Sequence, residues 1–175
     1  MNTFLPYPDI RKSLEALDKR RLVKQRLEAS QLCKLEYERV FREKAGLPEL
    51  RAAWINHPAA MMYRGYLPFL RLYYNISIDV CNERGIANNS FEYFILPNKA
   101  EKPWWFGVPE FHWAMKCNLL AKDFNFYSRE FRAELSTLVL NQAYYWPRAV
   151  PYLRLGNTQL HFNAYTKEFT RLNSR

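Results

Sequence analysis

The residues best suited to catalysis lie between positions 18 and 29, in the stretch Asp-Lys-Arg-Arg-Leu-Val-Lys-Gln-Arg-Leu-Glu-Ala. On a helix, spacings of four and seven residues put Arg21, Gln25 and Glu28 on one face, and Lys24 lies four residues before Glu28. A carboxylate framed by phosphate-binding cations can act as a general acid or base. The alternative is a solvated charged face with ion pairs along the helix, and spacing alone does not separate the two.

The helix that carries this face is expected to run from about residue 18 to residue 44. Apolar residues recur on it at helical spacing, and a glycine and a proline follow its end: Leu22, Ala29, Cys33 and Val40, then Gly46 and Pro48. A shorter helix is expected before it, with Asp9 as its N-cap.

A short helix is also expected over residues 58–64, followed by a break at Gly65 and Pro68. After the break a long helix is expected to run to residue 84, with Gly85 as its left-handed cap. Two further helices are expected over residues 109–122 and 124–140. Residues 87–105 are interpreted as a loop, and 142–175 as an aromatic, irregular segment that can hold short strands. We therefore predict an all-α fold, a compact single-domain helical bundle over residues 1–175 with long irregular loops.

The composition favours a polyanionic partner. Among 175 residues, 26 Lys and Arg face 17 Asp and Glu, a formal charge of +9, and such an excess suits phosphate contacts. Aromatic residues make up 17% and suit either stacking on unpaired bases or core filling.

The sequence also indicates a cytoplasmic, intracellular protein. It contains no run of 18 apolar residues, and its start lacks the pattern of a secretory signal, so no membrane association is expected. Cys33, Cys81 and Cys117 lack zinc-ligand spacing and are expected to be small buried side chains in a reducing compartment.

Four blocks, in order, resemble the pyrimidine dimer DNA glycosylase (endonuclease V) family, particularly its larger cellular and viral members. The first block is Thr-Phe-Leu-Pro-Tyr-Pro-Asp at 3–9 with Asp18, Arg21, Leu22 and Glu28, and the second is Trp-Ile-Asn-His-Pro-Ala at 54–59, Met-Tyr-Arg-Gly-Tyr at 62–66 and Glu-Arg-Gly at 83–85. The third is Pro-Glu-Phe-His at 109–112 with Lys116, Asn118, Leu119, Leu120, Lys122 and Asp123, and the last is Tyr145-Trp146-Pro147. Residues 87–105 and 150–175 carry no part of this resemblance.

The resemblance implies an all-α enzyme of a bacterial or virus-infected cell that cleaves the glycosidic bond at an ultraviolet-induced pyrimidine dimer and then nicks the strand. The implied nucleophile is the chain's own α-amine, which attacks the sugar C1′ and forms an imine, and the implied supporting carboxylate is Glu28. No metal and no cofactor is implied. Family members expose a small residue after loss of the initiator methionine, whereas the second residue here is Asn2. The amine therefore belongs to Met1 or to Asn2.

The expected partner is damaged or modified double-stranded DNA, with no obligate protein partner. Residues that could contact it are Arg21, Lys24, Gln25 and Arg26 on the first long helix, His57 and Arg64 in the second helical region, His112 and Lys116 four residues apart, and Tyr145 with Trp146. Each has a structural alternative, namely capping, core filling or a solvated face.

Three rival functions remain at this stage. A relative could act on other modified bases, the chain could bind nucleic acid without catalysis, or it could be a structural protein with a basic surface.

Overall fold

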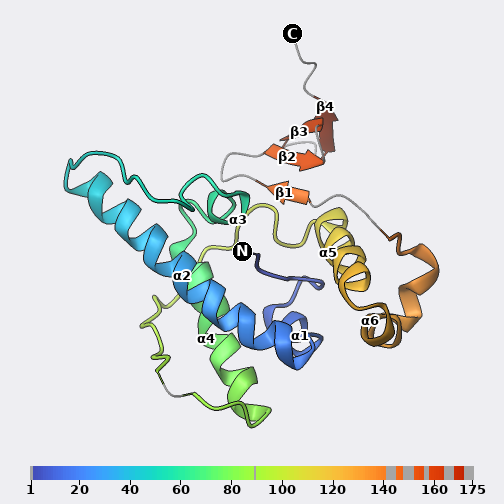
Figure 1. The fold of residues 1–175 in the computed structure, drawn as a ribbon. Coiled ribbons are helices and arrows are strands. Elements are labelled where there is room, and N and C mark those ends of the chain that lie inside the picture. Colours follow the sequence, from blue (N-terminus) through green and yellow to red (C-terminus); the bar gives the residue numbers. More distant parts are fainter. Residues whose placement is uncertain are drawn as a thin grey trace.

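The computed structural model describes residues 2–88, 90–140 and 145–147, and the backbone of 152–155, 158–163 and 168–171. Its helical elements are α1 (Ile10–Glu15), α2 (Lys19–Lys44), α3 (Pro58–Met61), α4 (Leu67–Glu83), α5 (Pro109–Lys122), α6 (Phe124–Glu130) and the 3-10 helix η1 (Arg132–Thr137) (Figure 1). The chain is mostly helical, as the sequence predicts.

Side-chain caps explain where the first helices begin. Asp9 accepts a hydrogen bond from the Lys12 amide at 2.7 Å and starts α1, and Asp18 accepts one from the Arg21 amide at 3.0 Å and starts α2. Gly46 and Gly85 end α2 and α4 with φ of 64°, a left-handed conformation that glycine adopts without a steric penalty. The expected bounds of α2, α4 and α5 are confirmed within about three residues.

The core lies between α2 and α4, which pack along each other. Leu22, Ala29 and Cys33 of the predicted apolar stripe are fully buried there, while Val40, near the end of α2, is half-buried. The segment between α4 and α5 forms no helix or strand in its described residues, as predicted. It nevertheless supplies Trp105, whose fully buried indole donates a hydrogen bond to the Met62 carbonyl at 3.0 Å. The three cysteines are buried and unpaired, as expected.

The prediction of one helix over residues 124–140 is wrong. Helix α6 ends at Glu130, and a 3-10 helix follows from Arg132. The break falls at Phe131, whose ring stacks on Tyr127 with centroids 5.5 Å apart and meets the Tyr7 ring edge at 6.2 Å. Burial of this ring takes precedence over helix continuation.

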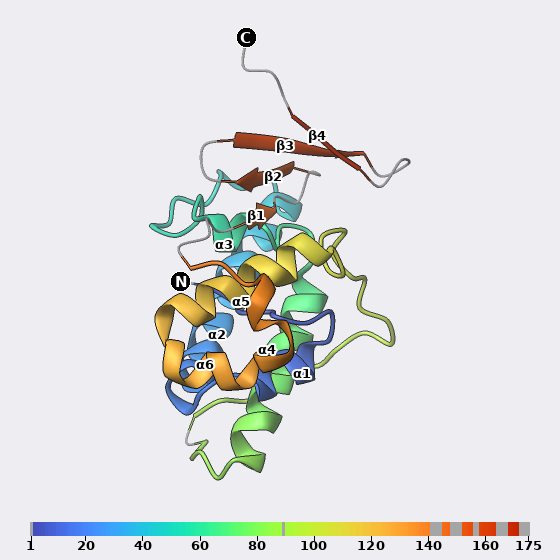
Figure 2. The same ribbon diagram turned by 90° about the vertical axis from the view of Figure 1, so that its right-hand side faces the viewer.

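The C-terminal part of the chain forms a small antiparallel sheet where the sequence favoured an irregular segment with short strands. The strands β1 (Tyr145–Pro147), β2 (Tyr152–Leu155), β3 (Thr158–Asn163) and β4 (Glu168–Arg171) pair in chain order, with Trp146 opposite Arg154 and Leu153 opposite Leu160. Strand β1 contacts α3 and α5, so the sheet continues from the helical body on that side (Figure 2).

The segment before α1 runs between α2 and α5 rather than along the surface (Figure 1). On one side the Phe4 amide donates to Gln25 of α2, and on the other the Leu5 carbonyl accepts from His112 of α5. Thr3, Phe4 and Leu5 are all buried. Residues 3–5 are therefore part of the interior, and their position is set by two helices.

Candidate active site

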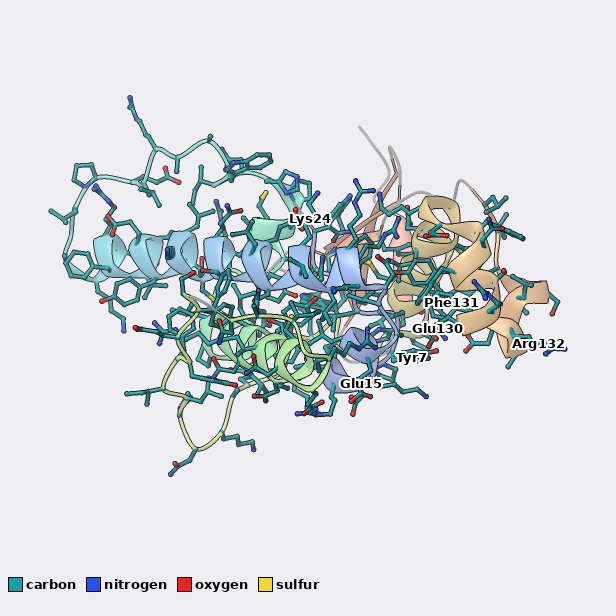
Figure 3. The ribbon with its side chains drawn as sticks, turned by 60° about the horizontal axis from the view of Figure 1, so that its bottom comes forward. Tyr7, Glu15, Lys24, Glu130, Phe131 and Arg132 are labelled. Atoms are coloured by element: carbon teal, nitrogen blue, oxygen red, sulfur yellow. The ribbon has the colours of Figure 1, made fainter. Side chains whose placement is uncertain are left out.

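The start of the chain meets the predicted acidic residue directly. The backbone nitrogen of Asn2 donates a hydrogen bond to Glu28 Oε2 at 3.0 Å. Glu28 is largely buried, with 8% of its surface exposed, and its Oε1 lies 3.7 Å from Lys24 Nζ. Lys24 itself is mostly exposed and reaches the carboxylate from the solvent side of α2 (Figure 3). A backbone nitrogen, a carboxylate and a cation thus share one spot.

This spot opens into a cleft of about 400 Å³. Four of its described lining residues are cationic and one is acidic; the lining consists of Asn2, Phe4, Arg20, Arg21, Lys24, Gln25, Glu28, Lys122 and Trp146. The positive side chains come from α2 on one wall and from the end of α5 on the other. The excess of positive side chains over negative ones makes the cleft favourable for anionic groups such as phosphates.

Arg21 is held in a fixed orientation at the cleft by its neighbours. Its Nη1 lies 2.6 Å from Asp18 Oδ2, the Tyr127 hydroxyl donates to the same oxygen at 2.7 Å, and Arg21 lies over the Tyr127 ring at 5.4 Å. Burial opposes ionisation of Asp18, but the hydrogen bonds from Arg21 and Tyr127 outweigh it and lower the pKa of that carboxyl. Asp18 is therefore a permanent anion that orients the guanidinium.

The model of the pyrimidine dimer DNA glycosylase family matches residues 1–93 of the 175. This chain belongs to the pyrimidine dimer DNA glycosylase family. No curated protein and no solved structure matches the chain. The matched region contains α1 to α4, and with them Asn2, Glu28 and the α2 wall of the cleft, whereas Lys122 and Trp146 lie beyond it.

Three of the residues predicted to bind DNA, Arg26, Lys116 and His112, are largely buried and have partners within the protein. Arg26 is 5% exposed, donates to the Ala87 carbonyl at 3.1 Å and lies over the Phe91 ring at 4.4 Å. Lys116 is paired with Glu134, and its Nζ lies 4.5 Å from the centroid of the Tyr7 ring and 6.0 Å from that of Phe131. Figure 3 labels Tyr7 and Phe131. Helical spacing placed both correctly on their helices but could not show which face the rest of the chain covers.

His112 is the third of these residues, and its contacts fix its tautomer. The Gly107 amide donates to His112 Nε2 at 3.0 Å, so Nδ1 carries the proton and donates to the Leu5 carbonyl at 2.7 Å. Burial lowers the pKa of this imidazole, which keeps it neutral. His112 therefore anchors the segment before α1 and is not among the described residues that line the cleft.

Gln25 lines the cleft, but its carbonyl oxygen is already engaged. Oε1 accepts hydrogen bonds from the Phe4 amide and from the Tyr73 hydroxyl, both at 2.7 Å. With 1% of its surface exposed, Gln25 contributes to the shape of the cleft more than to its outer surface.

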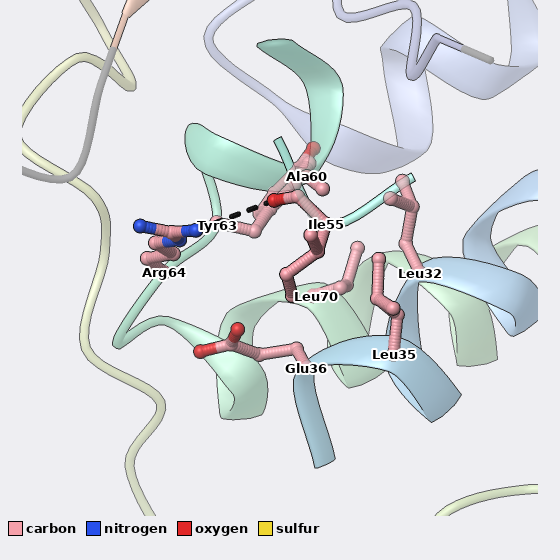
Figure 4. Close-up of a pocket in the computed structure, with 8 residues that line it drawn as sticks. All are labelled: Leu32, Leu35, Glu36, Ile55, Ala60, Tyr63, Arg64 and Leu70. Atoms are coloured by element: carbon pink, nitrogen blue, oxygen red, sulfur yellow. Dashed lines mark hydrogen bonds between the residues drawn. The ribbon is translucent and has the colours of Figure 1, made fainter. Parts of the chain in front are cut away.

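The second helical region reaches the cleft only at its edge. His57 Nδ1 accepts the Ala59 amide at 3.1 Å and caps α3, while its ring lies 6.0 Å from that of Trp146, which lines the cleft. Burial lowers the pKa of His57. Arg64 lies elsewhere, beside Glu36, and donates to the Ile55 carbonyl at 3.3 Å (Figure 4).

The remaining predicted residues have different places. Trp146 lines the cleft, and Tyr145 is half-buried on the same strand without lining it. Met1 lies outside the described residues, so the prediction for its amine is not tested by the structure.

Phe4, Arg20 and Lys122 line the cleft but were not among the predicted site residues. Arg20 lies four residues before Lys24 and eight before Glu28, so helical spacing could have added it to the stripe. Lys122 is distant in sequence and reaches the cleft only because α5 packs beside the segment before α1.

Among the described residues, no group of three or more His, Cys, Asp or Glu side chains is placed to hold a metal ion. None of the described helices combines the length and apolar character required to cross a bilayer.

Proposed function

We propose that this chain is a DNA repair glycosylase with abasic-site lyase activity, acting on pyrimidine dimers in double-stranded DNA. The observation that carries the proposal is the 3.0 Å contact between the Asn2 nitrogen and Glu28 Oε2 inside a cleft with four cationic side chains. Removal of Met1 would turn this nitrogen into an α-amine held against a carboxylate, the arrangement that imine chemistry requires, and the cations would supply phosphate contacts.

The proposed reaction begins at the sugar C1′ of the damaged nucleotide. The neutral amine forms a bond to C1′ while the glycosidic bond breaks, and the base leaves with the bonding electron pair and takes up a proton. Glu28 takes a proton from the nitrogen and gives it to O4′ as the C1′–O4′ bond breaks, so that opening of the sugar ring leaves a protonated imine. An α-amine has a free pKa of roughly 7.7–8, so a useful fraction is neutral at cellular pH without strong desolvation. Glu28 accepts and returns protons at the nitrogen.

The imine then serves as an electron sink for strand cleavage. Loss of a proton from C2′ sends its electron pair toward the imine, the 3′ phosphate leaves by β-elimination, and water hydrolyses the imine to release the amine. Damaged bases stack poorly, so exposing the lesion costs less than the few kcal/mol per base that an intact duplex demands. Arg20, Arg21, Lys24 and Lys122 are the proposed phosphate contacts around the opened site.

Two chain starts are compatible with this proposal. Loss of Met1 makes the nitrogen at Glu28 the α-amine of Asn2 itself. Retention of Met1 moves the amine one residue further along, a reach of about 3.5 Å. In both cases the Asn2 backbone nitrogen contacts Glu28.

Borohydride trapping tests the proposal. The protein is incubated with a duplex containing one abasic site and with a duplex containing one pyrimidine dimer, reduced, and digested so that the attached peptide is identified by mass. We expect a covalent adduct at the first residue of the chain, and none after acetylation of that amine. Absence of any adduct would favour a non-catalytic DNA-binding protein, and an adduct with abasic but not dimer DNA would favour a relative acting on other bases.

A further inference from the structure

Asn2 owes its position to its neighbours along the chain rather than to its own side chain. Its backbone nitrogen contacts Glu28, but its side-chain Oδ1 and Nδ2 are buried and have no hydrogen-bond partner among the described residues. The next two residues, by contrast, are both anchored. The Tyr63 hydroxyl donates to Thr3 Oγ1 at 2.8 Å, and the Phe4 amide donates to Gln25 Oε1 at 2.7 Å. Whatever holds Thr3 and Phe4 therefore sets the place of the Asn2 nitrogen.

The anchor at Phe4 is part of a larger hydrogen-bond network than the anchor at Thr3. Gln25 Oε1 has two lone pairs, and they accept from the Phe4 amide and from the Tyr73 hydroxyl, each at 2.7 Å. The Tyr73 hydroxyl also lies 3.3 Å from the Phe4 carbonyl. Gln25 and Phe4 are almost fully buried and Tyr73 is fully buried, so water cannot replace these bonds. Burial raises the pKa of Tyr73 well above its ordinary value, which keeps the hydroxyl a donor.

Gln25 and Glu28 lie three residues apart on the same helix, so the anchor and the carboxylate form one rigid unit. We propose that Gln25 and Tyr73 are positioning residues that clamp the Phe4 backbone and so hold the Asn2 nitrogen at the Glu28 carboxylate. Neither side chain touches the reacting atoms. This inference rests on the proposed function for its catalytic consequence, but the clamp itself can be measured without substrate.

The clamp predicts a specific kinetic signature. Gln25→Met keeps the length and burial of the side chain but removes the acceptor, which leaves the Phe4 amide unpaired and frees the segment to shift. A displacement of about 1 Å at a reacting atom can cost roughly 100-fold in rate. The cationic lining residues are untouched, so the dissociation constant for the abasic duplex should stay within about two-fold of the wild-type value.

The experiment compares Gln25→Met and Tyr73→Phe with the wild type, and Gln31→Met serves as the control because Gln31 is exposed on the same helix. Duplex affinity and the single-turnover rate of borohydride-trapped adduct are measured separately. We expect the adduct rate to fall about 100-fold in Gln25→Met and less in Tyr73→Phe, with duplex affinity retained in both and nothing changed in Gln31→Met. Wild-type adduct rates in both clamp variants, or a loss confined to affinity, would overturn the inference.

Hydrogen exchange at the Phe4 amide tests the clamp without DNA. The Phe4 amide should be protected from exchange in the wild type and should exchange faster in Gln25→Met. If Gln25→Met does not fold, Tyr73→Phe provides the same test, because it removes only one hydroxyl group. Unchanged exchange at Phe4 in both variants would refute the clamp. If the wild type forms no adduct while Phe4 exchange responds as expected, the proposed reaction fails and the clamp stands.

Discussion

Proton transfer at an amine demands a carboxylate that is close, oriented and shielded from competing water, and Glu28 has these properties. It is largely buried, it accepts from the Asn2 nitrogen at 3.0 Å, and Lys24 approaches its second oxygen at 3.7 Å. The cation and the backbone nitrogen lie on different oxygens, so Glu28 contacts Asn2 through one oxygen while it remains paired with Lys24 through the other. This geometry makes Glu28 the most informative single residue to change.

Glu28→Gln should slow turnover severely while leaving DNA binding nearly intact. The amide keeps the size of the side chain and an acceptor oxygen but cannot take up a proton, and general acid–base contributions are typically 10² to 10⁴-fold, so a loss of about that size is expected. The measurement is single-turnover nicking of a dimer-containing duplex beside a binding titration, with the exposed Glu101→Gln as control. Full activity in Glu28→Gln would remove this carboxylate from the mechanism.

At the residue scale, the sequence predicted what helical spacing controls. Glu28, Arg21, Gln25 and Lys24 share the cleft because α2 is a regular helix. Spacing could not show that Arg26, one residue after Gln25, turns inward onto the Phe91 ring. Nor could it show that the Gln25 oxygen is already engaged, because its two partners lie 21 and 48 residues away in sequence.

At the scale of elements, the site is a gap between two helices with the start of the chain inserted in it. Helix α2 supplies Glu28 and the Gln25 anchor, and α5 supplies His112, whose Nδ1 donates to the Leu5 carbonyl at 2.7 Å. The same imidazole accepts from the Gly107 amide, just before α5 begins. A neutral His112 therefore joins three parts of the chain, and protonation would remove its acceptor.

Stability should fall in mild acid through this histidine. Burial lowers the pKa of His112 in the folded chain, so below the ordinary value of 6.5 the unfolded chain binds a proton that the folded chain does not. The stabilising difference is fully present above pH 6.5 and is lost as the pH falls from there toward the lowered folded value. We expect Tm to be lower at about pH 5.5 than at about pH 7.5.

His112→Gln isolates this contribution, because burial lowers the pKa of His57 as well and gives a background in the same direction. Melting curves of both proteins across the pH range supply the comparison. The variant should lose part of the wild-type dependence. Identical pH dependence in the two proteins would show that His112 does not titrate on unfolding.

The turn at Gly65, just before α4, is held by the buried carboxylate of Glu36 on α2. Glu36, which is labelled in Figure 4, accepts from Arg39 Nε and Nη2, both at 2.7 Å, and from the Gly65 amide at 2.9 Å. Glu36→Gln removes the charge and one acceptor while its surroundings stay buried, and should lower the free energy of unfolding by about 1–3 kcal/mol. Glu43→Gln is the matched control, since Glu43 pairs with the same arginine but is 70% exposed, and should cost under about 1 kcal/mol. Urea titration measures both, and equal costs would contradict the assigned role of burial.

The same scale explains which elements the sequence could predict. Helices α1, α2 and α5 begin at capping residues or prolines and have regular apolar spacing, so the sequence was sufficient to predict their bounds. The helix breaks at Phe131 because this ring packs against Tyr127 and Tyr7, and the local sequence around Phe131 does not indicate that packing. The C-terminal strands pair only with one another in chain order, and their short lengths give little periodicity to detect.

At the scale of the whole molecule, the charge of +9 gives the protein a general attraction to DNA, and the cleft concentrates it. Arg20 and Lys24 stand on the α2 wall, whereas Lys122 comes from the end of α5. Lys122 lies outside the part of the chain that matches the family. A duplex seated in the cleft would thus be held from both sides, which requires the correct packing of α5 against the segment before α1.

Lys122→Met tests this two-sided grip through the salt dependence of binding. Each phosphate contact that is lost should make the slope of log K against log salt concentration less steep by about 0.9. We expect that change in Lys122→Met and none in Lys99→Met, because Lys99 is an exposed lysine of the segment between α4 and α5 that does not line the cleft. Arg20→Met should reduce the slope by a similar amount, and the double variant by about twice as much, since the two cations stand on opposite walls. A wild-type slope in Lys122→Met would mean that the α5 wall does not contact DNA, so that the duplex is bound from the α2 side alone.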